Sequence, residues 1–168
     1  MLIIEIDKTR YRRHFNIVIV ICISVLALGS LGIAQLLIAL FPAQEGTHFH
    51  WNLLGVVVSV AIIAIMFKVK KDDPFLYEVL YVWRLKQALN LIGRKIRKLK
   101  QAAKMGDTNA MLALQFSYTG SRQLWTLDDN TITLNSLDKS QRELDELLVK
   151  YDVSLDITQY KRTLLNAF

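Results

Sequence analysis

Two long apolar stretches without charged side chains lie in the N-terminal part of the chain. The first covers 27 residues, 15–41, and the second covers 17 residues, 51–67. A bilayer core about 30 Å thick is crossed by about 20 helical residues, with about 17 near the lower limit. The pattern therefore predicts two transmembrane helices over these ranges. A basic segment at 1–14 precedes them, and a short loop at 42–50 joins them.

Basic residues flank the two apolar stretches on the same predicted side. Lys8, Arg10, Arg12 and Arg13 precede the first stretch, and Lys68, Lys70 and Lys71 follow the second. The loop between them contains Glu45 and neither Lys nor Arg. Because Lys and Arg concentrate in cytoplasmic flanks, we expect both termini in the cytoplasm. The first stretch exceeds the apolar core of about 7–15 residues in a signal peptide, and we expect it to be retained.

The remaining segment, 68–168, shows helical periodicity and no sustained strand alternation. Asp73 and Pro74 are residue types preferred at a helix start, and Gly106 is a type preferred just after a helix end. Between them, apolar residues recur at alternating steps of three and four, as in a heptad seam. The seam, which we expect to be a packing or interaction surface, consists of Val82, Leu85, Leu89, Ile92, Ile96 and Leu99.

Shorter helices are expected to follow this long one. The predicted signals are an N-cap at Asp107 with a helix to about Arg122, a turn at 128–130, an N-cap at Ser136, and a capping box at Asp156 and Gln159. The expected fold is therefore an all-α membrane protein. An N-terminal two-helix transmembrane hairpin is followed by a C-terminal cytoplasmic helical domain, which a long basic helix leads.

Charge is distributed unevenly along the cytoplasmic segment. Residues 68–104 hold eleven Lys or Arg and three acidic residues, whereas residues 105–168 hold six and nine. The basic surface consists of Arg94, Lys95, Arg97, Lys98, Lys100 and Lys104. This surface is interpreted as a solvated helix face, as a surface for anionic lipid headgroups, or as a surface for nucleic acid. In a further interpretation, the acidic C-terminal half packs beside it and partly compensates its positive charge. Nucleic acid is the least favoured, since the chain lacks a helix-turn-helix and an aromatic-rich binding surface.

Small residues recur at four-residue spacing in both predicted spans. Ser30 and Ala34 lie in the first span, and Gly55 and Ser59 lie in the second. Such spacing lets helix backbones approach closely in lipid. We expect these residues to pack the hairpin against itself, and a homo-oligomer or membrane-protein partner would use a second face. No charged residue lies in either span, so a transport pathway through one copy is not expected.

Several short motifs carry a resemblance to a known family. They are residues 7–14 (DKTRYRRH), 52–56 (NLLGV), 78–87 (EVLYVWRLKQ), 124–125 (LW) and 127–131 (LDDNT). Together they resemble an uncharacterised family of small gammaproteobacterial inner-membrane proteins with two transmembrane helices, over nearly the whole chain. The resemblance implies a multi-pass protein of the bacterial inner membrane whose loop faces the periplasm, and it carries over no catalytic residue. Residues 106–110 (GDTNA), with Leu112, Leu114, Tyr118 and Gly120 downstream, separately resemble half of a Sel1-type helical repeat.

Reactive side chains are sparse. The one metal-like cluster is His48 and His50 with Glu45 nearby. Its H-x-H spacing can place two imidazoles on one ion, whereas a dependable site provides three or four ligands. The single cysteine, Cys22, lies inside the first span, and the cytoplasmic segment contains no histidine. The turn at 128–130 is interpreted as ordinary backbone capping. We therefore expect no catalytic residue, no metal, no cofactor and no small-molecule substrate.

These patterns favour a non-enzymatic inner-membrane anchor or scaffold that contacts itself or another protein through its cytoplasmic helical domain. Tyr77, Tyr81 and Trp83, near the expected membrane exit, are candidate aromatic anchors. One alternative is an accessory subunit or modulator of a membrane enzyme or transporter, acting through the small residues of its spans. Another is binding of anionic lipid or nucleic acid at the membrane surface through the basic run at 94–104.

Overall fold

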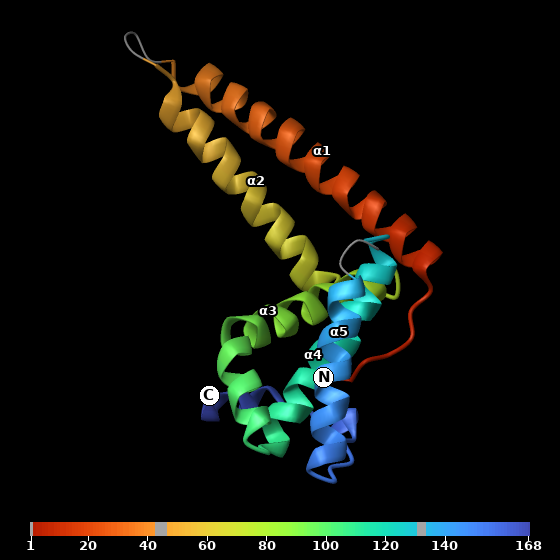
Figure 1. Cartoon of the computed structure of the whole chain (residues 1–168). Helices are drawn as coiled ribbons and strands as arrows, with labels where there is room; N and C mark the ends of the chain where they lie inside the picture. Colours follow the sequence, from red (N-terminus) through yellow and green to blue (C-terminus); the bar gives the residue numbers. More distant parts are fainter. Residues whose placement is uncertain (1, 43–46, 131–133) are drawn as a thin grey trace. The chain divides into compact units, whose positions relative to one another are not determined.

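The computed structural model describes residues 2–42, 47–130 and 134–168, and these residues form helices without strands (Figure 1). The elements are the α-helices α1 (Lys8–Leu40), α2 (Phe49–Val69), α3 (Tyr77–Lys104), α4 (Thr108–Leu127) and α5 (Leu134–Lys150), and the 3-10 helices η1 (Ile157–Gln159) and η2 (Arg162–Ala167). The all-α prediction is confirmed for the described residues.

The chain divides into two compact units. The hairpin unit comprises Thr9–Leu80, and the helical unit comprises Met1–Lys8 together with Tyr81–Phe168. The first residues of the chain belong to the helical unit, and the first turn of α3 belongs to the hairpin unit.

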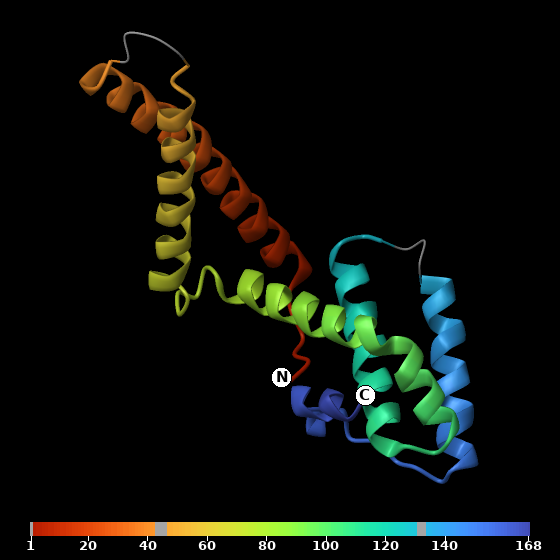
Figure 2. The same cartoon turned by 90° about the vertical axis from the view of Figure 1, so that its left-hand side faces the viewer.

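The hairpin unit is built on two antiparallel helices, α1 and α2 (Figure 2). Both are long and apolar enough to cross a membrane, by length and composition. Each extends beyond its apolar stretch, because α1 already begins at Lys8 and α2 ends at Val69. The helices diverge away from their connecting loop (Figures 1 and 2). Near their wider end, Leu76 and Val79 are buried together with Val18 of α1.

The segment before α3 differs from its prediction. α3 begins at Tyr77, not at Pro74. The Asp73 side chain instead accepts a hydrogen bond from the Phe75 N–H at 2.9 Å, and its carbonyl accepts one from the Leu76 N–H at 2.9 Å. Asp73 therefore caps a single tight turn, and the α-helical hydrogen bonds start only after that turn.

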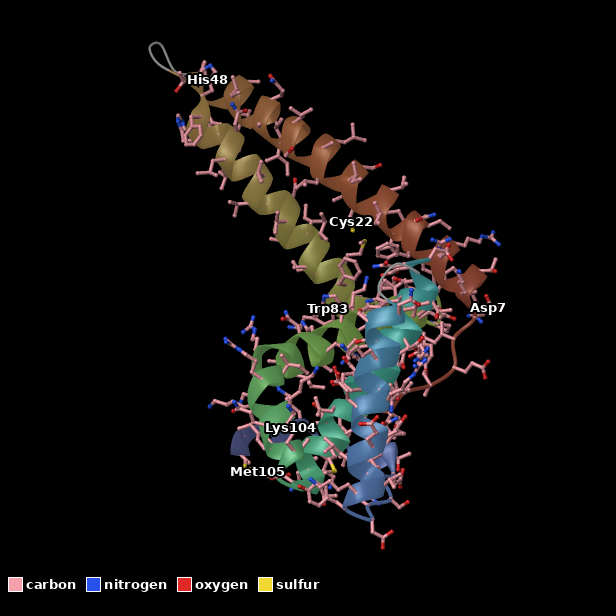
Figure 3. The ribbon with its side chains drawn as sticks, in the orientation of Figure 1. Asp7, Cys22, His48, Trp83, Lys104 and Met105 are labelled. Atoms are coloured by element: carbon pink, nitrogen blue, oxygen red, sulfur yellow. The ribbon has the colours of Figure 1, made fainter. Side chains whose placement is uncertain are left out.

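The end of α3 agrees with the prediction. Gly106 has a φ of +90°, in the left-handed region that glycine adopts without steric cost. Its N–H donates to Ala103 O, and the Asp107 N–H donates to Ala102 O. The Asp107 carboxylate then accepts a hydrogen bond from the Ala110 N–H at 2.9 Å and caps α4. Lys104 and Met105 mark this corner in Figure 3.

The later helices correct three predicted boundaries. α4 continues to Leu127, beyond the expected end near Arg122. α5 begins at Leu134, so Ser136 lies inside the helix and is not its N-cap. The expected last helix is a pair of 3-10 helices, although Asp156 does cap the first of them by accepting from the Thr158 N–H. Residues 131–133 lie outside the described part of the chain.

α4 forms the centre of the helical unit. Ala110, Met111, Ala113 and Phe116 are completely buried. The helix contacts α5, η1 and η2. Its Gly120 lies against α3, because a methyl group at this position would be 3.0 Å from Leu85 Cδ1 and 3.1 Å from Leu89 Cδ2. A helix with so many buried faces requires partners all around it, and α3, α5 and the C-terminal segment provide them.

Candidate functional site

The structure brings together the four small residues predicted to pack the spans. A Cβ built on Gly55 would lie 2.4 Å from the main-chain oxygen of Ser30 and 3.3 Å from Ala34 Cβ. Ser59 is fully buried, and a Cβ on Gly29 would lie 2.8 Å from its Oγ. The hairpin therefore uses these residues to bring α1 and α2 into close contact, which leaves this face of each helix occupied.

The outward faces of the hairpin are apolar. Leu28 of α1 is 74% exposed and Ile65 of α2 is 61% exposed. Large exposed side chains of the same kind include Val20, Ile23, Leu31, Leu36, Leu53, Val57 and Val60. Soluble monomers rarely expose contiguous apolar surface on this scale. A second face for a partner would have to use residues outside the packed pair, such as Gly32, where an added methyl group meets nothing within 4 Å.

A buried carboxylate lies at the wide end of the hairpin unit. Glu78 Oε1 forms an ion pair with Arg10 Nε at 2.9 Å, and the second carboxylate oxygen lies 3.3 Å from His14 Nδ1. The His14 ring also packs on Phe75, with ring centroids 4.2 Å apart. A buried carboxylate is costly unless it is paired and hydrogen-bonded. Glu78 therefore fixes the start of α3 against the basic first turns of α1.

The N-terminal residues form an arm that is held by the helical unit. The Ile4 N–H donates to the Tyr81 hydroxyl at 3.0 Å, and this hydroxyl donates to Gln123 Oε1 at 3.0 Å. The Gln123 amide in turn donates to the Ile4 carbonyl, which closes a cycle of three hydrogen bonds. Lys8 adds an ion pair with Asp129. The contact partners lie far apart in sequence, so local periodicity did not predict this arm.

The predicted seam of α3 lies mostly inside the chain. Val82, Leu85, Ile92 and Leu99 are buried, and Leu89 and Ile96 are half-buried. Packing within the helical unit therefore accounts for most of this surface. Of the predicted aromatic anchors, Tyr81 is buried and belongs to the N-terminal cycle, whereas Tyr77 and Trp83 are exposed. Trp83, labelled in Figure 3, is 55% exposed on α3.

The basic surface divides into two parts. Lys95 Nζ donates to the Leu165 carbonyl at 2.6 Å, and Lys98 Nζ donates to the main-chain oxygen of Phe168 at 2.7 Å. Arg94 and Arg97 are exposed beside them. Lys100 and Lys104 instead line a different hollow of about 290 Å³ that also includes Glu143 and Glu146 of α5. The acidic half of the chain thus lies near these two lysines.

The remaining candidates are the acidic turn at 128–130 and the metal-like cluster of the loop. Asp128 pairs with Lys86 at 3.1 Å and is the C-cap of α4, and Asp129 has a φ of 55° in the following turn. His50 packs on the ring of Trp51. The third member of the metal-like cluster, Glu45, lies outside the described residues. Within the described ranges, no group of three or more His, Cys, Asp or Glu residues is positioned to hold a metal ion.

Two buried phenols of the helical unit have perturbed acidity. Burial raises the pKa of Tyr118, which a hydrogen bond with Ser140 partly opposes. Burial also raises the pKa of Tyr160, whose ring stacks on Phe116 with centroids 4.1 Å apart. Both phenols pack in the core of the unit around α4. Their raised pKa values therefore follow from packing in the core.

Comparison with known proteins gives a family. No curated protein and no solved structure matches the chain. A family profile matches residues 1–165, which is nearly the whole length. The motifs of the sequence predicted membership of an uncharacterised family, and this prediction is confirmed. The chain belongs to the family described as "Protein of unknown function (DUF3087)".

Proposed function

We propose that the chain is a non-enzymatic anchor or scaffold of a bacterial inner membrane. In this proposal α1 and α2 span the bilayer, both termini lie in the cytoplasm, and the helical unit makes contacts with a second copy or with another protein. The observation that carries it is the division of the hairpin's surface. Small residues fill the space between the helices, and large uncharged side chains cover the outside. Such a hairpin needs lipid around it and no further protein to complete it.

The flanking charges support the orientation. The first turns of α1 carry Arg10, Arg12 and Arg13, and α2 is followed by Lys70 and Lys71. Neither span contains a charged side chain along its apolar stretch, so neither offers the ionisable groups that ion or proton pathways use. An anchoring role is consistent with both features.

In this proposal the helical unit makes the contact with the partner. Most residues of the α3 seam are buried in the core of the helical unit, so a partner must contact other residues. Trp83 is the exposed aromatic side chain on α3 that best fits such a surface, because Trp is enriched among residues that dominate binding energy. We propose that Trp83 belongs to the contact surface of the scaffold.

Native mass spectrometry of the full chain in mild detergent, combined with crosslinking in its own membrane, tests this role. We expect a defined oligomer or a stoichiometric complex that Trp83→Ala weakens. Met105→Ala is the matched control, since Met105 is an exposed apolar side chain at the far end of α3. A strictly monomeric species without crosslinked partner in the wild type would contradict the proposal.

A further inference from the structure

A basic pocket lies between α3 and the C-terminal segment of the helical unit. Its volume is about 470 Å³, and its lining consists of Arg94, Lys95, Arg97, Lys98 and Phe168. Figure 1 shows the C-terminal segment beside the second half of α3. Four of the five lining residues are cationic, and they come from adjacent turns of one helix. We refer to it as the Arg94 pocket.

The charges of the Arg94 pocket are not neutralised by acidic side chains. Cations three or four positions apart on one helix face repel each other. Elsewhere in the helical unit, Lys8, Lys86 and Arg122 each form an ion pair with an aspartate. Within the described ranges, no acidic side chain lines this pocket or forms an ion pair with its four cations. The pocket lining therefore places four cationic side chains around one hollow, and two of them contact main-chain oxygens of Leu165 and Phe168.

Two of the cations are held in place. The hydrogen bonds from Lys95 to Leu165 and from Lys98 to Phe168 join α3 to the C-terminal segment, 70 residues further along the chain. Each ammonium group has three N–H donors and uses one of them here, so further donors remain for a ligand. Arg94 and Arg97 contribute planar guanidinium forks, which match the geometry of phosphate oxygens.

We propose that the Arg94 pocket binds a phosphate ester. The two guanidinium groups and the two anchored ammonium groups would share the phosphoryl oxygens, and the Phe168 side of the pocket would contact the organic part. The volume is that of pockets for small organic ligands, which commonly measure about 300–1,000 Å³, and it exceeds the needs of a bare anion. The phosphate belongs either to a lipid headgroup or to a soluble metabolite, since both present the same chemistry.

The site is independent of the scaffold role. Every lining residue belongs to the helical unit, and none belongs to α1 or α2. Loss of binding and loss of oligomer formation are therefore separate results, because Trp83 does not line the pocket.

Isothermal titration calorimetry of the full chain in a neutral detergent tests the site with two probes. One is glycerol 3-phosphate, a soluble phosphate ester, and the other is a short-chain phosphatidylglycerol, with the matching phosphatidylcholine as zwitterionic control. We expect at least one anionic probe to bind. Binding of glycerol 3-phosphate identifies a soluble class of ligand, and binding of the anionic lipid alone identifies a headgroup. Both results support a phosphate site.

Paired charge variants decide whether the pocket itself binds. Arg94→Gln with Arg97→Gln should raise the dissociation constant by about tenfold or more, because hydrogen bonds to a charged group are lost. Lys100→Gln with Lys104→Gln removes the same charge from the same helix outside the pocket and should change it less than about twofold. Arg94→Lys with Arg97→Lys keeps the charge, loses the forks and should give an intermediate constant.

Circular dichroism and size-exclusion elution of each variant show whether its fold is intact. The substituted arginines are exposed, so we expect unchanged profiles. The proposal is overturned if the wild type binds neither anionic probe. It is also overturned if both glutamine pairs weaken binding equally, since that result describes a diffuse basic surface. Binding of an oligonucleotide in the absence of binding to either probe contradicts it as well.

Discussion

Replacing Gly55 by alanine tests the close packing of α1 and α2 with a single methyl group. The new Cβ would lie 2.4 Å from the Ser30 main-chain oxygen, whereas ordinary van der Waals contact begins at 3.4 Å. The obstacle is backbone and cannot rotate away, so the helices must separate locally. Overpacking of this kind costs about 1–3 kcal/mol, and separation also forfeits dispersion contacts along the interface. We expect Gly55→Ala to lower the free energy of hairpin separation by about 2 kcal/mol.

Titration of detergent-solubilised protein with sodium dodecyl sulfate measures this free energy. Trp51 provides the signal, because its ring stacks on Phe41 across the hairpin with centroids 5.6 Å apart. The background carries Trp83→Phe and Trp125→Phe, so that Trp51 is the only remaining tryptophan. The midpoint for Gly55→Ala should move to a lower detergent fraction.

Two further glycines provide matched controls on α1. Gly32→Ala adds the same methyl group where nothing lies within 4 Å, and we expect a change of less than about 0.5 kcal/mol. Gly29→Ala meets the Ser59 hydroxyl at 2.8 Å, which can rotate, so the effect should lie between the other two. An unchanged midpoint for Gly55→Ala, or equal shifts for Gly55→Ala and Gly32→Ala, would refute the packing argument.

Three other substitutions test the helical unit. Gly106→Ala places a side chain at φ +90° and 2.9 Å from the Tyr151 ring, so thermal unfolding should show a loss of about 1–3 kcal/mol. Tyr81→Phe removes the hydroxyl that accepts from the Ile4 N–H, and hydrogen exchange at Ile4 should accelerate without a comparable change in α4. Burial raises the pKa of Tyr118 in the folded state above the ordinary value of 10.0. The contribution of Tyr118 to the free energy of unfolding is therefore complete below pH 10.0 and is lost as the pH rises through the raised pKa. Tyr118→Phe should therefore flatten the fall of unfolding free energy above about pH 10 in alkaline denaturant titrations, and an unchanged slope would argue against this origin.

Local patterns predicted the elements better than their contacts. The apolar stretches gave the two hairpin helices, because length and absence of charge are properties of consecutive residues. Gly106 and Asp107 were predicted correctly for the same reason, since a left-handed residue followed by a side-chain cap is a local signal. Ser136 was misassigned because capping residues also occur within helices, and α5 already begins at Leu134.

The heptad seam illustrates a different limit. A regular apolar stripe on α3 has the same spacing whether it packs on its own chain or on another one. Leu85, Ile92 and Leu99 are completely buried within the chain itself, and Leu85 lies against Gly120 of α4. Sequence periodicity predicted which residues pack but not what they pack against.

Long-range contacts were beyond local patterns altogether. The hydrogen bonds of the N-terminal arm join Ile4 to Tyr81 and Gln123, 77 and 119 residues away. The Arg94 pocket likewise depends on the contact between the C-terminal segment and α3, which no sequence motif predicted. The basic run itself was visible in the sequence, whereas its concave arrangement with Phe168 required the fold.

We propose that α1 and α2 cross a membrane with both termini on its cytoplasmic side. Labelling of single-cysteine variants with a membrane-impermeant maleimide tests it most directly, in a Cys22→Ala background that removes the native thiol. Thr47→Cys lies in the loop and Lys139→Cys lies on α5, and both positions are exposed. We expect labelling of the Thr47→Cys variant in intact cells, and of the Lys139→Cys variant only after the membrane is permeabilised. Equal labelling of both variants in intact cells, or recovery of the chain in the soluble fraction, would contradict it.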